Sequence, residues 1–145
     1  MAALMRVLAM GVPGAEFAKG IQVVLNQRLI RKLCEHCKEA YTPTPQVLQQ
    51  LGIPPGRVEA LYRPPEQPEE VCPECDGIGY EGRTAIFELM RVDDGIRTTL
   101  ASDPTLGRLR QAARAAGMQN LQAEGIVLVA KGITALAELM RVMKQ

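Results

Sequence analysis

The sequence predicts a mainly α fold with a small β element, an α+β arrangement with a tetracysteine zinc module and a C-terminal helical bundle. Aromatic residues make up only 3% of the 145 residues and tryptophan is absent, so the core has to consist of Leu, Ile, Val, Met and Ala, which favours helices. Apolar residues recur at helical spacing near both ends of the chain. The run Arg83–Val92 contains β-branched and aromatic residues and predicts a strand.

Two helices are predicted in the first 30 residues. Helical spacing and the stop at Gly11 predict a helix over Ala2–Met10, with Leu4, Met5 and Leu8 on one face. A second helix is predicted over Ala15–Ile30, where apolar residues recur at intervals of three and four: Phe17, Ile21, Val24, Leu25 and Leu29. We expect the first helix to be amphipathic rather than a signal peptide, because no basic cluster precedes it.

The segment Tyr41–Pro68 holds seven of the ten prolines, so it predicts turns and extended chain. One short helix is expected there, over Gln46–Leu51 before Gly52. A flexible linker is the alternative to a loop that a metal fixes at both ends.

After the strand the pattern is helical. Asp93 or Asp94 is expected to cap a helix that ends at Ala101, and Asp103 to cap a helix with Pro104 at its first position. Leu106, Leu109 and Ala113 lie on one face of that helix, which stops at Gly117. Two further helices are predicted over Leu121–Lys131 and Thr134–Lys144.

The pentapeptide Glu-Leu-Met-Arg-Val occurs twice, at Glu88–Val92 and Glu138–Val142. We predict a strand for the first copy and a helix for the second. The preceding residues decide this, because the first copy follows β-branched and aromatic residues and the second follows an alanine-rich segment.

The four cysteines form two Cys-x-x-Cys pairs, Cys34/Cys37 and Cys72/Cys75. A gap of two residues lets one turn direct both sulfurs toward the same point, and two such turns predict a tetrahedral S4 site for zinc. A redox dithiol, an iron–sulfur cluster and disulfides are the alternatives. The site is expected to be structural, with His36 a solvated turn residue and Lys32, Lys38 or Arg83 offsetting its negative charge.

Composition narrows the classes of function. The chain is 47% hydrophobic, which is too high for a disordered protein, and no run approaches the roughly 20 apolar residues of a membrane span. Its net charge of +1 argues against a general polyanion binder. One local basic patch, Arg28, Arg31 and Lys32, lies just before the first cysteine pair and is expected to be a solvated helix face. We expect a cytosolic location, which disfavours disulfides.

Two segments carry a family resemblance. Gln27-Arg-Leu-Ile-Arg-Lys-Leu-Cys34-Glu-His-Cys37 resembles the QRLxRxLCxxC segment of the type II secretion and type IV pilus assembly ATPases. The stretch from Cys72 through Gly77, Gly79-Tyr80, Gly82-Arg83 and Glu88 resembles the CxxCxxxGYxGRxxxxE segment of the same family, and Gly117–Thr134 is similar to its closing helices. The resemblance extends over about Ala2 to Val142.

This resemblance implies a cytoplasmic motor, peripheral at the inner membrane, that works with an inner-membrane platform protein and with other subunits in a hexamer. Its core is RecA-like, and a zinc element is inserted near its end. It further implies three parts: residues 1–33 as the helical end of the ATPase core, 34–82 as the zinc module with its proline-rich loop, and 83–145 as a strand with a helical subdomain. The first two predicted helices are then expected to pack on the core sheet. The resemblance also implies an alternative for the basic patch Arg28, Arg31 and Lys32, a contact to the nucleotide site of a neighbouring subunit.

The family's phosphate-binding GxxxxGK[ST] loop and its magnesium-binding acidic strand do not occur in these 145 residues. The chain therefore corresponds to the C-terminal third of such a motor, as a split gene, a truncated product or an incomplete gene. ATP and Mg²⁺ are expected only in the full-length family, so we expect a structural and coupling role without catalysis by the chain alone. Cys72–Gly79 also resembles a CxxCxGxG repeat of the DnaJ chaperones, which leaves a stand-alone zinc-ribbon or chaperone-like module, binding protein or nucleic acid, as the alternative.

Overall fold

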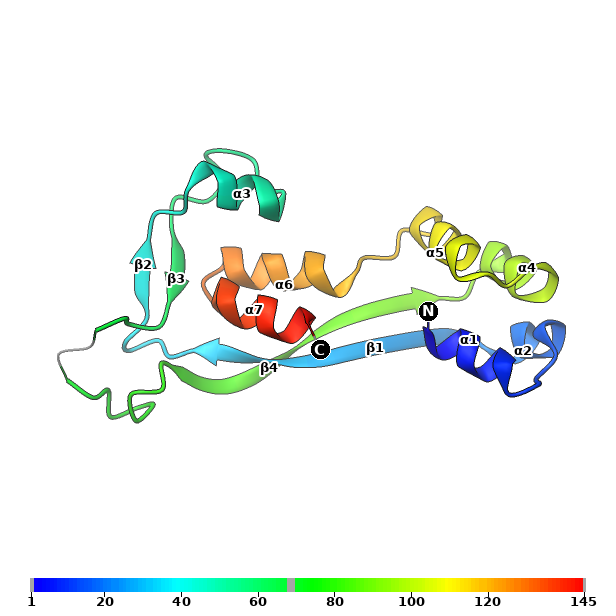
Figure 1. Cartoon of the computed structure of the whole chain (residues 1–145), viewed down its shortest axis with the longest axis horizontal. Coiled ribbons are helices and arrows are strands. Elements are labelled where there is room, and N and C mark those ends of the chain that lie inside the picture. The colour runs from blue at the N-terminus through cyan, green and yellow to red at the C-terminus, as the bar shows by residue number, and fades with distance from the viewer. Residues whose placement is uncertain (1, 68–69, 145) are drawn as a thin grey trace. The chain divides into compact units, whose positions relative to one another are not determined.

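The computed structural model describes residues 2–67 and 70–144, which form a mixture of helices and strands (Figure 1). The helices are α1 (Ala2–Ala9), α2 (Gly14–Gly20), α3 (Pro45–Leu51), α4 (Asp94–Ser102), α5 (Leu106–Ala115), α6 (Leu121–Ala130) and α7 (Leu136–Met143). The strands are β1 (Val23–Leu33), β2 (Glu39–Tyr41), β3 (Leu61–Arg63) and β4 (Tyr80–Arg91). The predicted mixed fold class is confirmed, with a larger share of strand than the small β element that we expected.

The chain divides into two compact units, and each unit combines two stretches of sequence. Unit 1 comprises Met1–Asn26 and Phe87–Asn120, and unit 2 comprises Gln27–Ile86 and Leu121–Gln145. The three consecutive parts expected from the sequence stay a prediction. The zinc module and the last two helices belong to the same unit.

The predicted helix over Ala15–Ile30 is wrong beyond Gly20. There α2 ends, and the chain continues as β1, which is hydrogen-bonded to β4 in a two-stranded sheet and runs in the opposite direction (Figure 1). Val23, Leu25 and Leu29 are exposed while Ile30 is buried, so alternate residues share a face, as in a strand. Pairing with β4 decides the conformation, because the apolar spacing fits both a helix and a strand.

Most of the C-terminal elements agree with their predictions. β4 covers the predicted strand except Val92. The first copy of Glu-Leu-Met-Arg-Val lies in β4 up to Arg91, and the second copy lies in α7. The side chain of Asp93 caps α4, accepting a hydrogen bond from the backbone N–H of Ile96 at 2.9 Å. The positive φ of Gly117 follows the end of α5, as expected.

The predicted cap of α5 at Asp103 is wrong. Its N-cap is Thr105, whose side chain accepts a hydrogen bond from the backbone N–H of Arg108 at 3.4 Å. Asp103 instead ends α4, and its carboxylate forms an ion pair with Arg108 at 2.9 Å. Two positions separated by Pro104 offered a capping oxygen, and Asp103 already forms the C-terminal cap of the preceding helix.

The proline-rich excursion is more ordered than predicted. Its last proline, Pro68, lies outside the described residues. The predicted short helix is present as α3, with Pro45 in its first turn and a left-handed Gly52 at its end. The sequence did not predict the antiparallel pairing of β2 with β3, which sets Glu39 opposite Arg63 and Tyr41 opposite Leu61. Strands of three residues are too short to carry a periodic signal.

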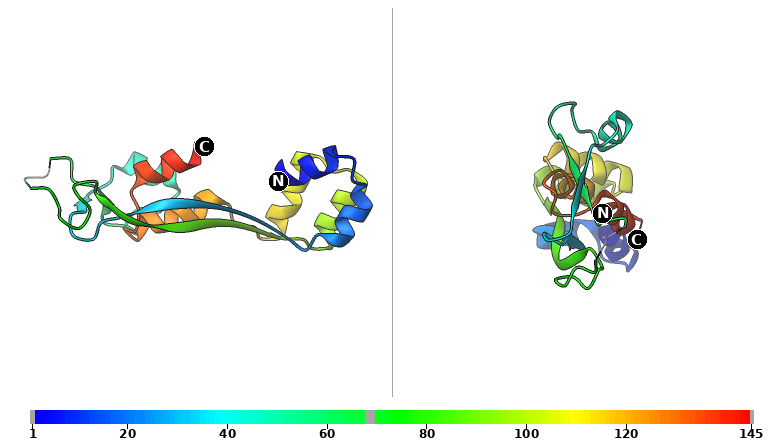
Figure 2. Two further views of the ribbon diagram at one scale, coloured as in Figure 1. Left: turned by 90° about the horizontal axis from the view of Figure 1, so that it is seen from below. Right: turned by 90° about the vertical axis from the view of Figure 1, so that its left-hand side faces the viewer.

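Each unit has its own hydrophobic core. In unit 1, residues of α1, α2, α4 and α5 surround the end of β4, and the buried members include Leu4, Met90, Ile96, Leu100 and Leu109. In unit 2, α6 and α7 lie side by side against the paired strands (Figure 2), and the buried members include Ile30, Leu61, Ile86, Val129 and Leu139. In the described part of the chain, no helix combines the length and apolar content of a membrane span.

Candidate metal centre

The structure brings the four predicted cysteines together within unit 2. Cys34 and Cys37 lie in the turn that follows β1, and Cys72 and Cys75 lie in a second turn before β4. The sulfurs of Cys34 and Cys72 are 3.9 Å apart, those of Cys37 and Cys75 are 3.6 Å apart, and all four lie within 4.8 Å of one another. Two turns separated by a long excursion therefore form one cluster.

These separations suit a metal better than a disulfide. A disulfide bond is about 2.05 Å long, so the two measured pairs are free thiols. A tetrahedral site with Zn–S bonds of about 2.3 Å places its sulfurs about 3.8 Å apart. Two of the sulfur–sulfur edges have nearly this length, and Cys34 and Cys75 are buried. The four residues thus provide the number of ligands, the sulfur atoms and the sulfur–sulfur distances of a closed zinc site.

One backbone hydrogen bond joins the two turns, and a second hydrogen bond supports a sulfur within the later turn. The N–H of Cys34 donates to the carbonyl of Gly79 at 3.1 Å, and the N–H of Gly79 donates to the sulfur of Cys75 at 3.2 Å. Gly79 has φ +77°, and a Cβ there would lie 2.5 Å from the Cβ of Pro64. A glycine is therefore required where the second turn passes the proline-rich excursion.

Without a metal, the cluster cannot hold four thiolates. Burial and the neighbouring sulfurs raise the pKa of Cys37 to about 12, and burial also raises the pKa of Cys34. Burial acts in the same sense on Cys75, but the N–H of Gly79 and the thiols around it outweigh burial and lower the pKa of Cys75. A divalent ion bound here has to displace protons, as thiolate ligands generally require.

The other residues expected near the site have separate environments. His36 is exposed, and it does not belong to the cysteine cluster in the described chain. Lys38 forms an ion pair with Glu35 at 2.6 Å and donates to the carbonyl of Gly132 at 3.3 Å. Lys32 and Arg83 are exposed. Lys38 therefore links the first cysteine turn to the connection between α6 and α7.

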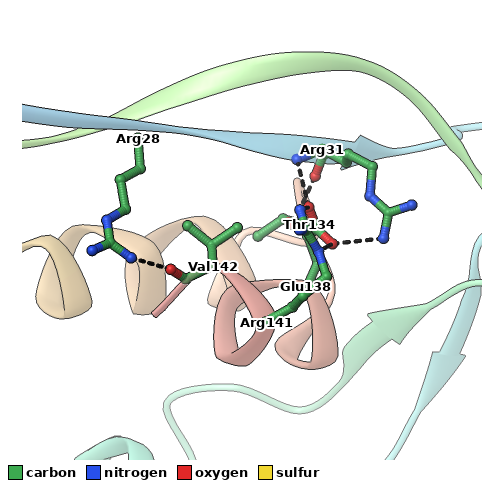
Figure 3. Close-up of polar contacts among 6 residues, drawn as sticks. All are labelled: Arg28, Arg31, Thr134, Glu138, Arg141 and Val142. Atoms are coloured by element: carbon green, nitrogen blue, oxygen red, sulfur yellow. Dashed lines mark hydrogen bonds and ion pairs between the residues drawn. The ribbon is translucent and has the colours of Figure 1, made fainter. Parts of the chain in front are cut away.

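A buried carboxylate that sequence reasoning missed lies next to this turn. The side chain of Glu138 in α7 has no exposed surface, and it forms ion pairs at 2.7 Å with both Arg31 and Arg141 (Figure 3). The guanidinium of Arg31 also stacks 4.1 Å from the ring centroid of Tyr80. A glutamate in the first turn of an amphipathic helix gives no sequence signal for burial.

The predicted basic patch is therefore not a solvated helix face. Arg28 donates to the carbonyl of Val142, and Arg31 binds Glu138, so both arginines contact α7 (Figure 3). Only Lys32 of the three is exposed. The patch was inferred from a helix that the structure replaces with β1, and the two arginines stabilise the interior of unit 2.

The surroundings of Glu138 change its acidity. Hydrogen bonds from Arg141, and then from Arg31, lower its pKa from 4.5 to about 2, although burial acts in the opposite direction. The backbone N–H of Arg31 adds a further hydrogen bond at 3.2 Å. The carboxylate is thus ionised at neutral pH and has two cationic partners, as a buried charge requires.

Gly132, between α6 and α7, is expected to be intolerant of substitution. Its φ is +67°, and a Cβ would lie 2.5 and 2.8 Å from two ring carbons of Tyr62. We expect Gly132→Ala to lower the free energy of unfolding by about 1–2 kcal/mol for the left-handed backbone and by a further ~1–3 kcal/mol for the ring contact. Urea unfolding followed by circular dichroism measures the sum.

Gly56→Ala is the matched control for this substitution. Gly56 has φ +78° in the same unit, and a Cβ there would meet nothing within 4 Å. Its cost isolates the backbone contribution. Equal losses from the two variants would show that Tyr62 does not constrain the α6–α7 connection.

Fold and site together define a class: a mixed α/β protein with a two-stranded sheet, helices packed against it and an inserted four-cysteine cluster. The family described as "Type II/IV secretion system protein" matches residues 1–141, and the chain belongs to this family. It is 36% identical over 140 residues to the type IV pilus assembly ATPase PilB of Thermus thermophilus, covering 95% of this chain and 15% of that protein.

Two further relatives show the same partial coverage. The chain is 32% identical over 143 residues to the type IV pilus assembly ATPase PilB of Pseudomonas aeruginosa, covering 97% of this chain and 24% of that protein. It is 33% identical over 143 residues to the type II secretion system ATPase E of Vibrio cholerae, covering 99% and 27%. The chain thus spans between about a seventh and a quarter of the length of these relatives.

Proposed function

We propose that this chain is the zinc-binding structural and coupling part of a type II secretion or type IV pilus assembly motor ATPase. The convergence of four cysteine sulfurs within 4.8 Å, in a member of this family, is the observation that carries the proposal. Cys34, Cys37, Cys72 and Cys75 would hold one Zn²⁺ with no ligand position left for water. Bound in this way, zinc supplies a structural crosslink between the two turns.

We propose that the chain does not hydrolyse ATP by itself. Phosphate binding in motors of this kind requires a glycine-rich loop with a lysine, and the pattern GxxxxGK[ST] does not occur in these 145 residues. Nucleotide and magnesium would bind to other parts of a full-length motor. The cysteine cluster is too enclosed in sulfur to activate water, so it offers no alternative hydrolytic centre.

The coupling role concerns proteins rather than small molecules. By analogy with the relatives, the partners would be an inner-membrane platform protein and neighbouring motor subunits, in the cytoplasm at the membrane surface. The zinc crosslink would keep the proline-rich excursion, with α3 at its tip, in a fixed position relative to the paired strands of unit 2. A fixed protrusion binds a partner with a smaller loss of conformational entropy than a mobile one.

Metal titration of the reduced 145-residue chain tests this proposal. We expect one Zn²⁺ per chain by elemental analysis, and replacement with Co²⁺ should give the visible spectrum of a tetrahedral thiolate site. The rate of ATP hydrolysis in the presence of the same preparation should equal the rate in buffer without protein. Absence of bound metal would refute the zinc centre, and turnover that persists through purification would refute the non-catalytic role.

A further inference from the structure

We propose that α7 and the cysteine cluster stabilise each other, with Glu138 as the residue that positions the first cysteine pair. The inference rests on the proposed zinc centre and goes beyond it. It assigns a role to a buried glutamate that binds no metal. It also makes the stability of the C-terminal helix α7 depend on whether the cysteine cluster holds a metal ion.

The connection between α6 and α7 contacts the chain on both sides of the first cysteine pair. Before the pair, the N–H of Leu33 donates to the carbonyl of Ile133 at 2.8 Å, and the buried hydroxyl of Thr134 donates to the carbonyl of Arg31 at 2.8 Å. After the pair, Lys38 donates to the carbonyl of Gly132 at 3.3 Å. Three consecutive residues of the connection therefore hold the segment that carries two of the four sulfurs.

Glu138 adds the strongest part of this contact. Its carboxylate accepts from the guanidinium of Arg31 at 2.7 Å and from the backbone N–H of the same residue at 3.2 Å (Figure 3). Arg141 donates to both carboxylate oxygens, at 2.8 and 2.7 Å, and thereby fixes the carboxylate on α7. Arg31 lies three residues before Cys34. The carboxylate of Glu138 thus fixes the backbone near the end of β1, three residues before Cys34, the first cysteine of the cluster.

The same short segment, Arg31–Lys38, therefore serves two functions. Its sulfurs would be held by the metal, and its backbone and cationic side chains are held by α7 and the preceding connection. Once either contact has ordered the segment, the other forms with a smaller loss of conformational entropy. Because such coupling is reciprocal, metal binding stabilises the ordered α7 by the same free energy by which the ordered α7 strengthens metal binding.

Hydrogen exchange of the full chain tests the first direction. We expect removal of zinc with a chelator to accelerate exchange of peptides covering α7 by about tenfold, within the range typical of coupled sites. Peptides of α4 and α5 in unit 1 serve as the internal reference. Faster exchange confined to residues 34–38 and 72–79, with α7 unchanged, would overturn the coupling.

Zinc affinity tests the reverse direction. Glu138→Gln keeps the size of the side chain and removes its charge, and we expect the equilibrium affinity for zinc, measured by competition with a coloured chelator, to fall about tenfold. Glu66→Gln, which neutralises the exposed ion pair with Arg63 in the same unit, should leave the affinity unchanged. Val129→Ala, which removes core packing in α6, controls for general loss of stability.

The outcomes separate the two proposals. A zinc affinity of Glu138→Gln that is no lower than that of either control variant would overturn the role of Glu138. If Glu138→Gln does not fold, hydrogen exchange of the wild-type chain alone decides whether α7 and the cysteine cluster are coupled. A wild-type chain that binds no zinc would overturn the metal centre together with this coupling, whereas a zinc-loaded chain with unchanged α7 protection would overturn the coupling alone.

Discussion

The double substitution Cys72→Ser and Cys75→Ser is expected to abolish zinc binding and to unfold most of unit 2. Removing two of four ligands leaves Cys34 and Cys37 as a single pair, and a serine hydroxyl stays protonated at neutral pH and is a poor ligand for zinc. The apparent binding free energy of structural zinc is about 10–16 kcal/mol in small zinc-finger peptides. This is comparable with the whole stability of a typical domain, about 5–15 kcal/mol.

The architecture around the cluster makes unit 2 sensitive to this loss. The hairpin of β2 and β3 pairs only three residues on each strand. This hairpin belongs to the proline-rich excursion. The excursion lies between the two cysteine pairs, so its two ends meet at the cysteine cluster. Without the crosslink, that long loop regains its conformational entropy. The burial of Leu61 and the packing of the half-buried Tyr41, Val47, Leu51 and Val58 against the core of unit 2 then oppose its unfolding. The core that α6 and α7 form with Ile30 and Ile86 is the part of unit 2 with the best prospect of remaining.

Thermal unfolding with and without added zinc measures the effect. Zinc should raise the melting temperature of the wild-type chain and leave that of the double variant unchanged. His36→Ala is the matched control, since His36 is exposed in the first turn and lies outside the sulfur cluster. A double variant that melts like the zinc-loaded wild type would show that the cluster contributes nothing to folding.

The sequence was sufficient to predict the cluster because the geometry of each cysteine pair is local, and a closed zinc site requires both pairs. A Cys-x-x-Cys pair fixes two sulfurs within one turn, whatever the rest of the chain does. The β4 strand was predictable for a similar reason, since Thr84, Ile86 and Phe87 favour an extended backbone without help from distant residues. Local preference also distinguished the two copies of Glu-Leu-Met-Arg-Val.

Features that depend on distant partners were not predictable. The apolar residues between Phe17 and Leu29 fit helical spacing, and only pairing with β4 makes most of this segment a strand. Glu138 contacts Arg31 across 107 positions of sequence, and nothing near either residue indicates the other. The basic patch was misassigned for this reason, because a charged side chain is expected at the surface until its partner is known.

Glu138 is expected to make the stability of unit 2 dependent on pH in the acid range. Its pKa is about 2 in the folded chain, mainly because Arg141 and Arg31 donate hydrogen bonds to it, against an ordinary value of 4.5. A lowered pKa stabilises the fold at every pH above the ordinary value, and this contribution disappears as the pH falls from about 4.5 to about 2. At neutral pH it is worth about 2–3 kcal/mol.

We therefore expect Glu138→Gln to lower the free energy of unfolding by about 2–3 kcal/mol at pH 7 and by almost nothing at pH 2. The loss should stay below the ~3–5 kcal/mol typical of a broken buried ion pair, because the side chains of Arg31 and Arg141 are 37% and 49% exposed and can be solvated once the carboxylate is gone. Urea unfolding of both proteins at a series of pH values gives the difference directly. A difference that does not change between pH 7 and pH 2 would mean that the carboxylate of Glu138 is not ionised in the folded chain.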